Sequence, residues 1–330
     1  MATVDPTQIA DWARNTGVLA MADAYDVDAA IYPQFCEVVG LDQLGDRPWG
    51  TRGTTITGVG EPKLWIEGNK ADAETIGQGY TWYLAAKLYG SSMEVPFSIM
   101  QSENPLRRTE NLVSHFVTQF GKRSLVAKDK RVAGVMQKGT LTAGSAEYFN
   151  NSYVDAADPA PTLIYDSLPF FDTLHTQKFG SNTFANHTVA RALNSANLDT
   201  TYVTMTTTNA KDERNEDIVN EPDTLVVPSN LRGTARVLLE SEHLPGSANN
   251  DIAIHNGRFN LIVNRYLTDD TDAWWLGAAG AGIRVVDSGI PEVTVTRDDT
   301  RHVIHINAAY RFGVTVTDWR PWYCCNKAAS

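Results

Sequence analysis

Cysteine is scarce in this sequence. The 330 residues include only three cysteines, Cys36, Cys324 and Cys325, which is too few for a disulfide framework. No second pair of Cys or His residues lies at zinc-ligand spacing from the adjacent Cys324 and Cys325. We therefore predict reduced thiols in a protein made in a cytoplasm.

The sequence also has no long apolar run and no excess of positive charge. No run of about 18 apolar residues is present, so we expect no membrane-spanning helix. The start MATVDPTQIADWARNT has neither the basic residues nor the apolar stretch of a secretory signal. The net charge of −11 repels phosphate backbones, which argues against sequence-specific binding or coating of nucleic acid. Non-specific contact with neighbouring DNA is still compatible with this charge.

Motifs of enzymes and nucleotide-binding proteins are missing as well. HExxH, GxSxG, GxxxxGK[ST] and GxGxxG are absent, and GAAGAG at 277–282 does not fit the dinucleotide-binding order. We predict a protein that is not an enzyme, with no catalytic, cofactor-binding or metal-binding residue and no cofactor. A hydrolase with an unusual site is the weakest of the alternatives, because only scattered histidines and carboxylates favour it.

The histidines are not spaced as metal ligands. His302 and His305 are three residues apart on an expected strand, so their side chains point to opposite faces. His175 and His187 flank a loop without an acidic or cysteine companion at ligand spacing. His115 lies in an expected helix, where we predict a place at the polar edge.

The segment TDDTD at 268–272 is the strongest candidate for a metal loop or a carboxylate pair. Asp269, Asp270 and Asp272 could bind calcium, but an EF-hand needs a mid-loop glycine and a closing glutamate, and Trp274 and Trp275 follow instead. We predict a turn after a strand, whose aspartates cap the next segment. The aspartates and the eight tryptophans leave one alternative function, a calcium- or sugar-binding β-rich adhesin.

Hydrophobic periodicity predicts the order of the elements in the first half. A helix is expected at about 6–24. The glycine-rich, aromatic residues 46–100 show strand-like alternation in TTITGV and KLWIEG, and their two extended segments, separated by a polar tract, suggest a long hairpin. Apolar residues recur at helical spacing over 105–137 and predict one long helix. Ser102 and Asn104 offer N-cap oxygens to it, and Gly121 suggests a bend.

The second half is richer in loops and strands. Residues 140–222 contain many residues that interrupt helices and strands. DTLVVP then predicts a short strand, SNLRGTARVLLES a helix capped by Ser229, and RFNLIVNRYL a second strand. The alternating segments IRVVDSG, EVTVTRD and HVIHINAAYRFGVTVTDW, within about 283–320, predict long antiparallel strands.

Four segments in this order resemble the tailed-bacteriophage major capsid proteins with the Hong Kong 97 fold, and most closely the phage Mu major head protein family. They are LPFFDTLH (168–175), PDTLVVPSNLRGTARVLLES (222–241), NLIVNRYLTDDTDAWWLGA (260–278) and HINAAYRFGVTVTDWR (305–320). LPFFDTLH departs from the family pattern by lacking the D-G-K lead-in. Trp275 stands where the family commonly has tyrosine.

The resemblance implies an α+β fold with four parts. These are an N-terminal arm (1–45), an extended loop (46–95), a peripheral domain (96–154 and 281–330, with a spine helix at 105–137) and an axial domain (155–280). The arm and the loop are expected to lie on neighbouring copies, because each would leave an apolar face in water on its own.

The implied function is a major head protein that self-assembles as pentamers and hexamers into an icosahedral shell around double-stranded DNA. The implied partners are further copies of the chain, a portal protein, a possible scaffold, decoration or cement protein, and DNA in non-specific contact, without a membrane. The implied location is the virion, after synthesis in the bacterial cytoplasm. Some members of this class crosslink a lysine to an asparagine. Lys63, Lys70, Lys87 and Asn326 have no matching sequence context, so no crosslink is assigned.

Overall fold

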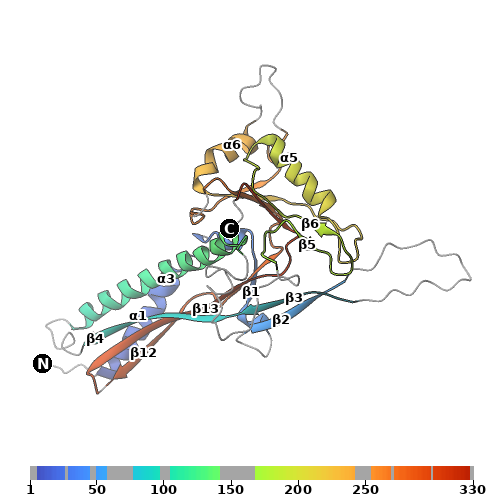
Figure 1. Cartoon of the computed structure of the whole chain (residues 1–330). Helices are drawn as coiled ribbons and strands as arrows, with labels where there is room; N and C mark the ends of the chain where they lie inside the picture. The colour runs from blue at the N-terminus through green and yellow to red at the C-terminus, as the bar shows by residue number, and fades with distance from the viewer. Residues whose placement is uncertain are drawn as a thin grey trace, which may run out of the picture.

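The computed structural model describes residues 6–26, 29–44, 50–57, 77–96, 105–141, 168–241, 254–268, 271–298 and 300–327. Helices and strands are mixed in an α+β arrangement (Figure 1). The long helix α3 runs beside strands β4, β12 and β13, and the shorter helices α5 and α6 lie at the opposite end of the molecule (Figure 1). The predicted α+β class is confirmed.

Helix α3 spans Pro105–Gln137, as the periodicity predicts. Pro105 suits the first turn, where a backbone N–H has no helical partner. The residues at helical spacing that face the protein, such as Val113, Val117 and Val132, are buried, and His115 is exposed as expected. The proposed N-cap residues Ser102 and Asn104 lie outside the described part of the chain.

The N-terminal helix α1 spans Pro6–Ala24, also as predicted, and it packs against α3 and strand β12 of the same chain. Met21 is buried there. A Cβ on Gly121 would lie 3.1 Å from the sulfur of Met21 and 3.4 Å from the Cβ of Ala24. Gly121 therefore permits the close approach of two helices, which is a different role from the predicted bend.

This packing corrects the view of residues 1–45 as a segment without an intramolecular partner. The short 3-10 helix η2 (Tyr32–Gln34) and strand β1 (Glu37–Gly40) also pack on the body of the chain. Tyr32, Phe35 and Cys36 belong to the main hydrophobic core. Several apolar side chains of this segment are thus buried within one copy, because α3 and the sheet supply the matching surface.

A five-stranded sheet lies against α3. Its path is β1, β11 (Ile283–Asp287), β13 (Val303–Val316) and β12 (Glu292–Asp298), and β4 (Lys87–Pro96) pairs with the other edge of β13. Strand β13 is antiparallel to β4, β11 and β12, as the alternation predicts, whereas β1 joins β11 in parallel. The buried residues between this sheet and the helices include Val95, Val293, Ile304 and Ile306.

A second sheet has the order β7 (His187–Thr188), β14 (Trp322–Cys325), β10 (Trp274–Gly277), β8 (Thr224–Val227) and β9 (Asn260–Val263). Helix α5 (Ser195–Val203), continued by the π-helical turn η4 (Thr204–Thr208), flanks it. The sheet is also flanked by the 3-10 turn η5 (Ser229–Leu231) and helix α6 (Arg232–Glu240).

One prediction needs correction in this second sheet, and one strand was not predicted. The expected cap Ser229 is the first residue of η5, and the preceding Pro228 occupies the N-cap without a side-chain hydrogen bond. Strand β14, for which no strand was predicted, lies within the expected peripheral range 281–330 and pairs with β10 and β7. The reason is that Trp322, Tyr323 and the cysteines need burial on both faces, which a central strand provides.

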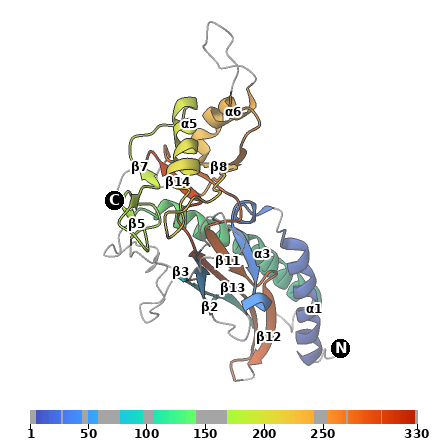
Figure 2. The same cartoon turned by 90° about the vertical axis from the view of Figure 1, so that its right-hand side faces the viewer.

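Strands β2 (Gly50–Ile56) and β3 (Gln78–Ala85) form the antiparallel hairpin predicted between residues 46 and 100. Past Ala86 the chain continues into β4, so the hairpin is joined directly to the five-stranded sheet. The predicted strand KLWIEG lies outside the described residues. Figure 2 shows the sheet between this hairpin on one side and helices α1 and α3 on the other.

Three short elements complete the fold. Strands β5 (His175–Thr176) and β6 (Thr183–Phe184) form a small hairpin, and the 3-10 helix η3 spans Leu41–Leu44. No helix in the ranges that the structure describes combines the length and apolarity needed to cross a membrane.

Candidate assembly surfaces

The root of the β2–β3 hairpin is fixed to the body by a small apolar cluster. Leu84 and Ala86 are buried against Val286 of β11, with Val39 and Leu41 packed around them. On the other side, the ammonium group of Lys178, between β5 and β6, donates a hydrogen bond to the carbonyl oxygen of Gly79. The hairpin is therefore held at its root by the five-stranded sheet and, near the Ile56–Gln78 pair at its other end, by the β5–β6 region.

The outward faces of β4 and α1 carry large apolar side chains. Leu88 of β4 is 62% exposed, and Val18 and Leu19 of α1 are 50% and 68% exposed. Helix α1 thus has apolar residues on its solvent side as well as on its buried side. The adjacent Val18 and Leu19 make α1 the stronger candidate for contact with another protein.

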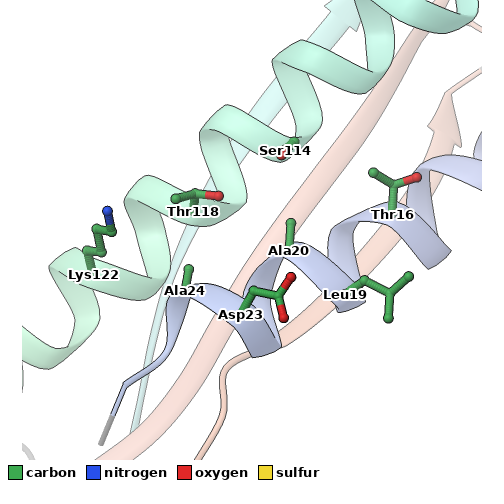
Figure 3. Close-up of a pocket in the computed structure, with 8 residues that line it drawn as sticks. All are labelled: Thr16, Leu19, Ala20, Asp23, Ala24, Ser114, Thr118 and Lys122. Atoms are coloured by element: carbon green, nitrogen blue, oxygen red, sulfur yellow. The ribbon is translucent and has the colours of Figure 1, made fainter. Parts of the chain in front are cut away.

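A shallow groove between α1 and α3 adjoins the exposed side of α1 (Figure 3). Its volume is about 420 Å³. Figure 3 shows hydroxyl-bearing, small and apolar side chains along the two helices, with one acidic and one basic residue among them. The lining residues are Thr16, Leu19, Ala20, Asp23, Ala24, Ser114, Thr118 and Lys122. This mixed lining suits protein contact, and it has no cluster of titratable groups for catalysis.

A buried polar cluster joins α1, α3 and the sheet. The Lys128 ammonium group lies 2.6 Å from a carboxylate oxygen of Asp287 and 2.6 Å from the Tyr25 hydroxyl. The Tyr32 hydroxyl donates to the second oxygen of Asp287, and the Gly289 N–H donates to the first. Burial lowers the pKa of Lys128, and the neighbouring Asp287 opposes that shift. Burial, with Asp287 next, raises the pKa of Tyr25 and Tyr32.

The residue after Lys128 holds the same segment by its backbone. One carboxylate oxygen of Asp129 accepts the N–H groups of Ile31 and Tyr32, at 2.9 and 3.0 Å. Burial raises the pKa of Asp129, while these two hydrogen bonds lower it. Sequence reasoning missed this clamp because a Lys-Asp pair inside a long helix looks like part of a solvated face. Only the tertiary contacts show that both side chains are buried.

The predicted turn after β9 is described in part. Asp269 and Asp270 lie outside the described residues, and Asp272 is exposed. The side chain of Asn264 accepts the N–H of Tyr266 and shapes the start of the turn. Trp274 and Trp275 are fully buried in β10, so the chain returns to the core after the turn, as predicted.

The other tryptophans near the C-terminus are also buried. Trp319 and Trp322 join Trp274 and Trp275 among the largest buried side chains. A sugar-binding platform needs exposed rings, so these four cannot supply one. The interpretation of the aromatic residues as core material, predicted for half-buried strands, is supported.

The histidines occupy separate structural sites. The His175 ring stacks on Trp319 with centroids 4.6 Å apart and hydrogen-bonds Asn186. The His187 ring lies 2.9 Å from the carbonyl oxygen of Lys327, and burial lowers its pKa. His305 lies in β13, while His302 adopts a positive φ in the turn before it. Within the described ranges no three or more His, Cys, Asp or Glu side chains could hold one metal ion.

The three cysteines are free and buried. Cys324 and Cys325 lie in β14 opposite Trp275 and Trp274. Burial raises the pKa of Cys325 to about 12 and also raises the pKa of Cys36. A thiolate is the reactive form of cysteine, so these thiols serve as small core residues.

Taken together, exposed apolar side chains lie on strand β4 and on the N-terminal helix α1. Residues 106–325 match the family model described as phage capsid protein. The chain belongs to the phage capsid protein family. No curated protein sequence matches it.

Two solved capsids share its fold. The procapsid protein of bacteriophage JBD30 is 12% identical, with a TM-score of 0.50 over 99% of this chain and 77% of that one. The capsid protein of cyanophage P-SCSP1u is also 12% identical, with a TM-score of 0.52 over 92% of this chain and 89% of that one. The predicted Hong Kong 97-type fold and the predicted role as a phage major capsid protein are confirmed.

Proposed function

We propose that this capsid protein assembles as pentamers and hexamers into an icosahedral shell that encloses double-stranded phage DNA. The observation that carries the proposal is the β2–β3 hairpin. It is joined to the sheet through β4, which presents the exposed Leu88. An exposed leucine on a strand gains stability when a second copy covers it. Contacts between different surfaces of identical copies can close into rings.

The proposed division of the chain keeps the expected four parts. They are an arm at 1–45, an extended loop at 46–95, a peripheral domain at 96–154 and 281–330, and an axial domain at 155–280. The five-stranded sheet with α3 supports the peripheral domain, and the second sheet with α5 and α6 supports the axial domain. Strand β14 argues for moving residues 322–325 to the axial domain.

Several partners follow from the proposed role. A shell needs a portal protein at one vertex, and a scaffold, decoration or cement protein could act on it. The net charge of −11 supports non-specific rather than tight contact with packaged DNA. Synthesis in the bacterial cytoplasm fits the three free thiols. Within the capsid family, the quoted segments favour likeness to the phage Mu major head protein.

Negative-stain electron microscopy of the purified full-length chain tests this proposal. We expect closed, hollow particles. Leu88→Asp should reduce the assembled fraction, because it removes the exposed apolar side chain that a second copy would cover. Ser92→Asp is the matched control on the same face of β4, where no apolar side chain is lost. A chain that stays monomeric at every concentration and salt condition tried would refute the proposal.

The alternative of a calcium- or sugar-binding adhesin has less support. The four buried tryptophans are unavailable to a sugar ring, and Asp272 has no acidic cluster around it within the described residues. A thermal-melting titration with millimolar calcium separates the two functions. A rise in the unfolding midpoint would favour the adhesin, and an unchanged midpoint would favour the shell protein.

A further inference from the structure

A stack of side chains connects the hairpin to the edge of the five-stranded sheet. Arg284 of β11 binds Glu37 of β1 through two parallel hydrogen bonds, Nε to Oε2 at 2.8 Å and Nη2 to Oε1 at 2.7 Å. The guanidinium group also lies over the ring of Trp82 of β3, whose centroid is 4.6 Å from Cζ. One arginine thus contacts both the sheet edge and the hairpin.

The stack continues into the second strand of the hairpin. Gly53 of β2 is paired with Trp82 across the hairpin. A Cβ on Gly53 would lie only 2.0 Å from an atom of the Trp82 ring. The indole therefore rests directly on the backbone of β2, which only glycine permits. Four strands, β1, β11, β3 and β2, are linked in this order by one carboxylate, one guanidinium group and one indole.

We propose that Arg284 is a positioning residue that fixes the direction in which the β2–β3 hairpin leaves the body. Because a partner copy would meet the hairpin at that angle, Arg284 also determines how regularly copies assemble. This second part rests on the proposed function, whereas the first part concerns the single chain.

The chemistry of the stack is suited to setting an angle. The apolar contacts of Leu84 and Ala86 hold the root in place, but apolar attraction has no preferred direction. The Lys178 ammonium group adds a hydrogen bond to Gly79, but from a flexible side chain that can follow a change of angle. A planar guanidinium group with a bidentate carboxylate on its edge and an indole at its face restricts rotation in a way that a lysine cannot.

The stack should add little to stability, which makes the inference testable. The Arg284 and Glu37 side chains are 27% and 39% exposed, so solvent weakens their attraction. Loss of Arg284 should therefore change the orientation of the hairpin much more than the unfolding midpoint. Loss of a residue with only a structural role would lower the unfolding midpoint and leave the orientation of the hairpin unchanged.

Distance measurements by pulsed electron spin resonance test the first part on the unassembled full-length chain. Spin labels on Thr54→Cys of β2 and His115→Cys of α3 report the angle, since both positions are exposed and the native cysteines are buried. We expect a single narrow distance distribution in the parent. Arg284→Ala should broaden it at an unchanged thermal midpoint. The control Arg301→Ala, at an exposed turn of the same sheet, should leave it narrow.

Arg284→Lys is the gentler second variant, should Arg284→Ala fail to fold. It keeps the charge but loses the fork and the flat face, so we expect the same broadening. A parent-like distribution in a folded Arg284 variant would overturn the inference.

Broadened distances should be accompanied by shells of mixed diameter. Irregular shells with an unchanged distribution would also contradict it. If the parent itself forms no shells, the proposed function fails, yet the distance distributions still decide the role of Arg284.

Discussion

Replacing Lys128 by methionine should destabilise the protein strongly. The Lys128 and Asp287 side chains are 0% and 6% exposed, with their charged atoms 2.6 Å apart. Methionine fills much of the same volume but leaves the Asp287 carboxylate buried without its cation. Breaking a buried ion pair in this way costs about 3–5 kcal/mol. The Tyr32 hydroxyl and the Gly289 N–H still donate to the carboxylate, so we expect the lower end, about 3 kcal/mol.

Urea unfolding of the unassembled chain, followed by far-ultraviolet circular dichroism, measures this loss. Lys122→Met on the exposed part of the same helix is the matched control, and it should change the free energy of unfolding by less than about 0.5 kcal/mol. The double variant Lys128→Met with Asp287→Leu removes both charges. It should recover part of the loss, because an apolar pair often replaces a buried ion pair without penalty.

The reasoning depends on an uncompensated charge, so two results would refute it. One is a cost for Lys128→Met below about 1 kcal/mol, within the range of an ordinary point substitution. The other is a double variant that loses the sum of the two single losses. Additivity would mean that the two side chains do not interact, although their atoms are in contact.

Three further predictions concern other buried sites. Gly121→Leu should lower the free energy of unfolding by about 1–3 kcal/mol, because leucine overpacks the α1–α3 contact. Proteolysis within α1 should increase, and an unchanged digestion pattern would count against the role of Gly121 in the close approach of the two helices. Burial raises the pKa of Cys325 from 9.0 to about 12, so the unfolded chain loses this proton first. Stability should therefore fall above pH 9 by up to about 1.4 kcal/mol per pH unit, and the fall should be shallower in Cys325→Ala in urea titrations. Burial lowers the pKa of His187 below 6.5, so the unfolded chain binds this proton more readily and stability should decrease as the pH falls below 6.5. His187→Gln should flatten that acid limb, and an equal slope in both proteins would contradict it.

The helices and strands with a regular hydrophobic period could be predicted from local sequence alone. The helices Pro6–Ala24 and Pro105–Gln137 have the bounds that periodicity predicts. The strands of 283–316 follow from strict alternation. In these segments one face is apolar and the other polar, so burial of the apolar face selects a single local structure. The turn after β9 was predicted for the same reason, because two tryptophans directly after a polar run require a return to the core.

Contacts between distant segments could not be predicted in this way. The sequence gives no sign that α1 packs within its own copy, that β14 leaves its neighbours for the second sheet, or that Lys128 is buried. The Arg284 stack likewise joins residues from four strands. Its members have no recognisable spacing along the chain, and sequence reasoning assigned no role to any of them.

The sequence by itself determined which segments are helix or strand and which of their faces must be covered, because these depend on periods of a few residues. The tertiary structure alone decided what covers each face. Burial of an apolar surface is non-directional and any matching surface satisfies it, so the choice between a partner in the same copy and one in another copy rests on shape and on polar contacts such as those of Lys128, Asp129 and Arg284.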